Sequence, residues 1–215
     1  MRLAALLVLA LLAATSVPVD LAHADPLVLN EILAGPARDW DGSGTFSSRD
    51  DEWVEVMNTS GAPLDLSPYV ITDGDSIPRY GLSGTLAAGQ VLLVTGKMSY
   101  DWEHATGNPA FGLSLGNSGD AVMLWKVVGA DTVVVDAYAY KSHEAAADRA
   151  IGRIPNGGGV WMLFDQLNPY TGTLQPGTTG CAPTPGTLNL CGAGTPTRSV
   201  TWGEVKTLYR DDGRR

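Results

Sequence analysis

Cysteine and histidine are scarce in this 215-residue sequence, with two and three residues respectively. The two cysteines are too far apart for a redox C-x-x-C motif, and no other soft ligand lies near them to complete a metal site. Basic residues are outnumbered as well, because 14 Lys and Arg stand against 23 Asp and Glu, which gives a formal net charge of −9. Without a basic stripe to displace the counterions of a phosphate backbone, nucleic acid is not expected as a partner.

Long apolar runs are absent apart from residues 3–17 near the N-terminus. Arg2 precedes this run, and residues 22–24 (AHA) follow it with the small-x-small pattern that signal peptidase recognises. We therefore expect residues 1–24 to be a secretory signal peptide. A membrane anchor is the alternative, but the run is short for a span and no cysteine follows it for lipid attachment. The sequence predicts a secreted, extracytoplasmic protein without a transmembrane anchor.

Helical periodicity is rare along the rest of the chain, whereas 26 glycines and 13 prolines provide frequent turn signals. Alternation in residues 52–57 places Val54 and Val56 on one face and Trp53 and Glu55 on the other, which is the pattern of a half-buried strand. Regular short strands of this kind predict an all-β sandwich or barrel. The expected strands are 27–33, 52–57, 69–72, 91–94, 120–125, 132–138, 149–153 and 160–163.

The composition changes to Gly, Pro and Thr after about residue 176, and both cysteines lie in this part of the chain. In an exported protein, Cys181 and Cys191 are expected to form a disulfide that closes a short loop, worth roughly 2–3 kcal/mol of stability. We expect residues 25–178 to form the sandwich and residues 179–198 to form a linker that contains the disulfide.

The last stretch, residues 199–215, has a different pattern. Thr201 and Glu204 have the spacing of a capping box, and one helical face would carry Trp202, Val205, Leu208 and Tyr209. The sequence therefore predicts a short amphipathic C-terminal helix. It would pack either onto its own sandwich or onto a partner.

Six motifs occur in the same order as in a known family, and the chain resembles the lamin-tail domain of exported bacterial proteins. The motifs are residues 29–32 (LNEI), 51–58 (DEWVEVMN), 64–66 (LDL), 86–90 (LAAGQ), 111–120 (FGLSLGNSGD) and 151–157 (IGRIPNG). The resemblance covers about residues 26–170.

The resemblance implies an all-β, immunoglobulin-like β-sandwich of lamin-tail type without enzymatic activity of its own. Such domains usually accompany enzymes or surface modules as binding or attachment units. We therefore expect a secreted, non-catalytic binding module whose partner is an extracellular protein, polymer or surface. The alternative is an accessory module that docks onto a separately encoded exported enzyme through the C-terminal helix.

Residues 39–50 (DWDGSGTFSSRD) have the spacing of a calcium-binding loop, with Gly44 at the bend. This pattern predicts Ca²⁺ as a cofactor, although position 5 is a serine and position 12 an aspartate instead of the usual glutamate. Asp51 or Glu52 could replace or join the last ligand. The alternative is an acidic, solvated loop between the first two strands. The predicted ligands are Asp39, Asp41, Ser43, the Thr45 carbonyl, Ser47 and Asp50.

A serine hydrolase is a remote alternative. Residues 112–116 match the G-x-S-x-G motif around Ser114, and Asp136 and His143 follow in the order of one hydrolase class. That motif requires a strand before the serine and a helix after it, whereas a glycine turn and another strand follow here. We expect no enzymatic activity.

Residues 97–109 form a long connection for a sandwich and contain Tyr100, Trp102 and His104. Long aromatic loops often serve recognition, and the alternative is a loop whose aromatic side chains cover the core. The candidate partner-binding residues are Tyr100, Trp102, Trp202, Leu208 and Tyr209.

Overall fold

The structure, a computed structural model, describes residues 25–108 and 111–191. The signal peptide expected at 1–24 and the helix expected at 199–215 lie outside the described residues, so neither is tested here. Within the described part of the chain, no helix has the length and apolar character needed to cross a membrane.

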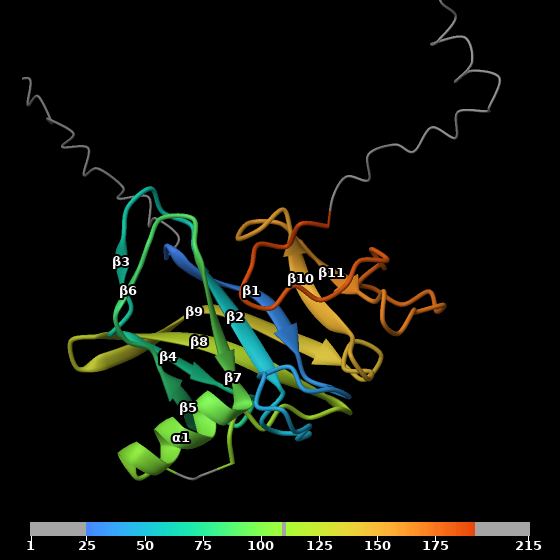
Figure 1. Cartoon of the computed structure of the whole chain (residues 1–215). Coiled ribbons are helices and arrows are strands. Elements are labelled where there is room, and N and C mark those ends of the chain that lie inside the picture. The colour runs from blue at the N-terminus through green and yellow to red at the C-terminus, as the bar shows by residue number, and fades with distance from the viewer. Residues whose placement is uncertain (1–24, 109–110, 192–215) are drawn as a thin grey trace, which may run out of the picture.

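The described chain consists mainly of antiparallel strands that build two large sheets (Figure 1). The elements are β1 (Leu27–Leu33), β2 (Trp53–Asn58), β3 (Leu64–Asp65), β4 (Tyr69–Thr72), β5 (Pro78–Gly81), β6 (Thr85–Leu86), β7 (Val91–Thr95), α1 (Gly96–Thr106), β8 (Gly119–Val128), β9 (Asp131–Lys141), β10 (Ala150–Ile154) and β11 (Val160–Phe164). The five-stranded sheet has the order β11-β10-β1-β2-β7, and the four-stranded sheet has the order β5-β4-β8-β9. Strands β3 and β6 form a separate small pair.

The main hydrophobic core takes side chains from both large sheets. Val54 and Ile151 come from the five-stranded sheet, and Ile71, Val122 and Leu124 come from the four-stranded sheet. Each fully buried side chain of this size stabilises the fold by roughly 1.5–3 kcal/mol. The expected all-β sandwich is therefore confirmed.

Strand β2 is buried on both faces, so the prediction of a half-buried strand at residues 52–57 is wrong. Trp53 and Glu55, on the face opposite the main core, have 0% exposure. Trp53 packs edge-on against Trp40, with ring centroids 6.3 Å apart, and Glu55 accepts a hydrogen bond from the backbone of Gly186. The second face is covered because two segments outside the sheet lie against it.

Helix α1 replaces most of the loop expected at residues 97–109, so that expectation is wrong as well. The Thr95 side chain accepts a hydrogen bond from the backbone N–H of Met98 and caps the N-terminus of the helix. Gly107 ends the helix with a φ of 74°, which is the left-handed conformation that glycine adopts easily.

The buried positions of α1 explain why hydrophobic periodicity missed it. Gly96, Ser99 and Glu103 have the three-to-four-residue spacing of one helical face, but none of them is a large apolar residue. The Ser99 hydroxyl donates to the carbonyl of Arg79, at 2.7 Å, and the Glu103 carboxylate accepts the backbone N–H of Gly112 at 2.8 Å. Polar contacts therefore hold the helix against the four-stranded sheet.

We predict that Leu124→Ala lowers the free energy of unfolding by about 2–5 kcal/mol, because it opens a cavity between the two sheets. Leu124 is fully buried, whereas Leu174 is 59% exposed. Leu174→Ala, the matched control, is expected to change stability by less than about 0.5 kcal/mol. Chemical denaturation measures both values, and equal losses would contradict this location of the core.

Candidate binding sites

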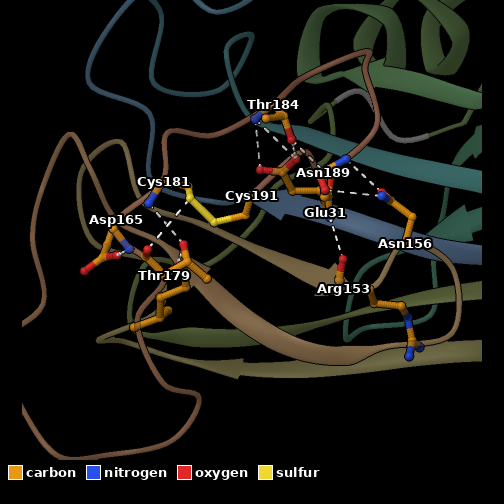
Figure 2. Close-up of a disulfide and its surroundings, with 11 residues drawn as sticks. Glu31, Arg153, Asn156, Asp165, Thr179, Cys181, Thr184, Asn189 and Cys191 are labelled. Carbon is orange, nitrogen blue, oxygen red and sulfur yellow. Dashed lines mark hydrogen bonds between the residues drawn. A yellow bond between two sulfur atoms is a disulfide. The ribbon is translucent and has the colours of Figure 1, made fainter. Parts of the chain in front are cut away.

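Cys181 and Cys191 form a disulfide, with their Cα atoms 5.7 Å apart (Figure 2). We call residues 181–191 the strap. Both cysteines pack against a small apolar cluster that contains Trp53 and Phe164. The composition of this segment suggested a linker, but up to Cys191 the strap lies against the five-stranded sheet.

Two glutamates on adjacent strands bind the strap (Figure 2 shows the Glu31 side of this contact). Glu31 accepts the backbone N–H of Thr184 at 3.1 Å, and its second oxygen lies 2.5 Å from the Thr184 hydroxyl oxygen. Glu55 accepts the backbone N–H of Gly186 at 2.9 Å and the side-chain amide of Asn30 at 2.8 Å. Both glutamates have 0% exposure, so these donors replace the water that the carboxyl groups lose.

Burial raises the pKa of Glu31 to about 8 and that of Glu55 to about 7, from an ordinary value of 4.5. Hydrogen bonds from Thr184 to Glu31 and from Asn30 to Glu55 act in the opposite direction without cancelling the effect of burial. At neutral pH the Glu31 carboxyl therefore holds a proton. Sequence reasoning did not select these glutamates as site residues, because their partners lie more than 130 residues further along the chain.

Three carboxylates meet in the loop between β1 and β2. One oxygen each of Asp39, Asp41 and Asp51 lies within 4.8 Å of the other two. Carboxylate oxygens at this separation suit a hard cation such as Ca²⁺. The structure thus brings together two predicted ligands, Asp39 and Asp41. The third member is Asp51, the alternative considered from the sequence, and Asp50 is not part of the group.

The same carboxylates also order the backbone of this loop. The chain turns just before β2, where the N–H of Asp51 donates to the carbonyl of Ser47 at 3.1 Å. Because of this turn, the carboxylate of Asp51, and not that of Asp50, lies beside those of Asp39 and Asp41. Backbone N–H groups around the loop then complete the hydrogen bonding of the carboxylates. Asp39 accepts those of Gly42, Ser43 and Gly44, and Asp51 accepts those of Trp40, Asp41 and Ser47.

The remaining predicted ligands form hydrogen bonds within the loop. The Ser43 hydroxyl donates to the Thr45 carbonyl at 3.0 Å, and the Ser47 hydroxyl accepts the N–H of Asp50 at 3.2 Å. Their oxygens therefore lie in the same loop as the three carboxylates.

Two of the candidate partner-binding residues, Tyr100 and Trp102, lie on α1 and have different roles. Trp102 packs against Tyr80, with ring centroids 6.2 Å apart, and it lies so close to Gly81 that an added Cβ there would be 2.9 Å from its ring. Trp102 therefore covers the edge of the sheet. Tyr100 is 40% exposed, and its ring lies tilted against that of His104 with the centroids 4.0 Å apart, so it remains available to a partner. The other three candidates, Trp202, Leu208 and Tyr209, lie outside the described residues.

The residues of the hydrolase alternative have other partners. Asp136 forms an ion pair with Arg153 at 3.0 Å, and the His143 ring lies 3.1 Å from the carbonyl of Gln175. Ser114 has a φ of 56° in a turn that leads into β8, and no helix follows it before that strand. The geometry therefore provides no support for a serine nucleophile here.

The outer face of the four-stranded sheet is apolar. Val70, Trp125 and Val134 are cross-strand neighbours on β4, β8 and β9, and Val127 pairs with Thr132 in the next row. We call these five residues the valine face. Val127 and Val134 are 43% and 46% exposed. An open cavity of about 190 Å³ lies here, lined by Val70, Thr72, Ser76, Pro78, Trp125, Val127 and Thr132.

Comparison with known families decides the classification. A family model for the Lamin Tail Domain matches residues 22–142, which is more than half of the chain. The chain belongs to the lamin tail domain family. No curated protein matches the sequence at a significant level.

Lamin tail domains have an immunoglobulin-like fold and are generally non-enzymatic protein-interaction modules, so the expected fold class is confirmed. The matched span of this lamin tail domain contains Glu31, Glu55 and the acidic loop. Strands β10 and β11 and the strap follow after residue 142. The covered face of the five-stranded sheet is thus built from residues within and beyond the family match.

The raised pKa values predict that this lamin tail domain loses stability as the pH rises from about 4.5 to about 8. A folded-state pKa above the unfolded value means that the stabilising contribution is fully present below about pH 4.5 and is lost as the pH rises through about 7 for Glu55 and about 8 for Glu31. Glu31→Gln keeps an acceptor for the Thr184 amide and removes one titrating group.

We expect the fall in unfolding free energy between pH 5 and pH 9 to be smaller in Glu31→Gln than in the wild type, as measured by denaturation across this range. Asp131→Asn, a substitution at the exposed first residue of β9, is the control and should follow the wild-type curve. Parallel curves for Glu31→Gln and the wild type would contradict the assignment.

Proposed function

We propose that this lamin tail domain is an exported, non-catalytic binding module that attaches to an extracellular protein through the valine face. The partly exposed apolar row formed by Val70, Trp125 and Val134 is the observation that carries this proposal. Apolar side chains gathered on one outer sheet face favour a protein interface, because contact with a partner removes them from water. The N-terminal signal-peptide pattern and the disulfide support export.

The chemistry of the valine face fits recognition better than catalysis. The indole N–H of Trp125 donates to the hydroxyl of Thr72 at 3.0 Å, so its hydrogen-bonding requirement is already met. The cavity lining contains no charged side chain. Such a surface offers shape and apolar area to a partner, but no group that would transfer a proton or attack a substrate.

We also propose that Ca²⁺ stabilises the loop that contains Asp39, Asp41 and Asp51. The close approach of three carboxylates supports this, since the cation would offset their mutual repulsion. The loop packs against the five-stranded sheet through Trp40 and Trp53. Calcium would therefore stabilise the sandwich itself as well as the loop.

The alternative function is that of an accessory module that docks onto a separately encoded exported enzyme. The identity of the captured partner separates the two functions, because recovery of an exported enzyme would identify an accessory module. The predicted C-terminal docking helix lies outside the described residues, so the test relies on the valine face.

We predict that replacing Val127 and Val134 together by Asp abolishes partner binding without unfolding the sandwich, because both side chains are exposed in the free protein. Affinity capture from the secreted fraction, followed by mass spectrometry, compares this variant with the wild type. Val160→Asp is the matched control, since Val160 is 69% exposed on β11 of the other sheet. A partner retained equally by all three proteins would contradict binding through the valine face.

We predict that Ca²⁺ raises the thermal unfolding midpoint of the wild type. A ligand that binds only the folded state at about 100 times its dissociation constant adds about 2.7 kcal/mol of stability. Asp39→Asn should remove most of this shift while leaving an oxygen to accept the N–H groups of Gly42 and Ser43. Asp131→Asn, outside the loop, should keep it. An identical wild-type midpoint with calcium and with a chelator would exclude the site.

A further inference from the structure

A β-bulge places two polar side chains of β1 against the strap. Leu29 pairs with Val56, and the next paired residue, Glu31, lies opposite Glu55, so Asn30 is the extra residue on β1. The side chains of both Asn30 and Glu31 form hydrogen bonds with strap residues. Strict alternation would have sent one of them toward the hydrophobic core.

The sheet surface beneath the strap carries no side chain at Gly152. This residue lies opposite Glu31 on β10, and a Cβ added to it would be 2.6 Å from the side-chain nitrogen of Asn189. The same Cβ would be 2.8 Å from the ring of Phe164. Because glycine has no side chain, this position leaves room for the side chain of Asn189 among β1, β10 and β11.

Asn189 fills this space, and its polar groups all have partners (Figure 2). Its side-chain N–H groups donate to the carbonyls of Arg153 at 3.0 Å and Asn30 at 3.3 Å. Its side-chain oxygen accepts a hydrogen bond from the Asn30 amide. Its backbone N–H donates to the side-chain oxygen of Asn156 at 2.8 Å, and its carbonyl accepts the side-chain N–H of Asn156 at 3.3 Å. Asn189 is only 5% exposed, and its donors and acceptors all meet complementary groups. We call this buried polar site the Asn189 socket.

The rest of the strap is held in the same way. The backbone N–H groups of Thr184 and Gly186 donate to Glu31 and Glu55, while Leu190 at the end of the strap is 78% exposed. The strap forms no strand of either large sheet. Specific polar contacts at residues 184, 186 and 189 therefore position it, as they would position a bound peptide.

We propose that the outer face of the five-stranded sheet is a peptide-binding groove, which this chain fills with its own strap. The ligand is an uncharged segment that makes a β-turn over residues 184–187 and has the pattern Thr-x-Gly-x-x-Asn, as in residues 184–189. The strap of a second copy has this chemistry, so the occupant in trans is the same segment from another molecule.

The disulfide keeps the groove filled in cis. It ties the two ends of the strap together and so restricts residues 184–189 to a closed loop, which lowers the entropy lost when they bind the groove. An external dithiol opens it by supplying two electrons and two protons: the S–S bond breaks, two thiols form at Cys181 and Cys191, and the reagent leaves as its own disulfide. The strap of a second copy then competes more effectively for the groove, because the strap of the same chain is held there less tightly.

The test uses the full chain with Cys181→Ser, Cys191→Ser and Asn189→Ala, which weakens the strap in cis. The probe is a fluorescein-labelled peptide of residues 181–191 with serine at both cysteine positions. Fluorescence anisotropy should show saturable binding to this variant. A peptide with alanine at the Asn189 position should bind about tenfold more weakly or worse, and oxidised wild type should bind neither peptide.

Equal binding of the two peptides, or no binding by a folded variant, would overturn the proposal. Loss of near-UV circular dichroism in the variant would also count against it, because the strap would then be inseparable from the sandwich. The wild-type chain held reduced by a dithiol carries no substitution and provides a second measurement. It should bind the asparagine peptide at least about tenfold more tightly than oxidised protein does, and a dimer should appear in sedimentation velocity as its concentration rises. A reduced chain that stays monomeric would exclude exchange between copies.

Discussion

Two buried carboxyl groups, those of Glu31 and Glu55, determine how the outer face of the five-stranded sheet is closed. A carboxyl group without hydrogen-bond partners in such a place would cost several kcal/mol, so the chain must provide donors or a proton. It provides both: backbone N–H groups of the strap bind the two glutamates, and burial favours the protonated form. The disulfide and the Asn189 socket follow from this requirement, since each helps to keep those donors in position.

The two outer faces of the sandwich consequently differ. The strap and the acidic loop cover the face of the five-stranded sheet, where even Glu55 is inaccessible to water. The valine face on the four-stranded sheet has no such cover among the described residues, and its apolar side chains remain partly exposed. The family's role in protein interaction agrees with our proposal that the open face receives the partner.

Local pattern was sufficient to predict most of the strands, because alternation and glycine turns depend on residues close in sequence. It failed for α1, since the buried face of that helix is built from Gly96, Ser99 and Glu103, which have no hydrophobic signal. It also treated the strap as a linker. The two glutamate contacts that hold the strap join residues more than 130 positions apart, and no local pattern contains them. In the acidic loop, spacing identified Asp39 and Asp41, but a single turn of the backbone decided between Asp50 and Asp51.

Amide hydrogen exchange of the oxidised protein tests most directly whether the strap closes the five-stranded sheet. The hydrogen bonds to Glu31, Glu55 and Asn156 predict that the amides of Thr184, Gly186 and Asn189 are strongly protected, close to those of β1 and β2. The amide of Leu190, a residue that is 78% exposed, should in contrast exchange faster. If the three amides exchange as fast as that of Leu190, the strap does not close the sheet, and the account of the covered face is wrong.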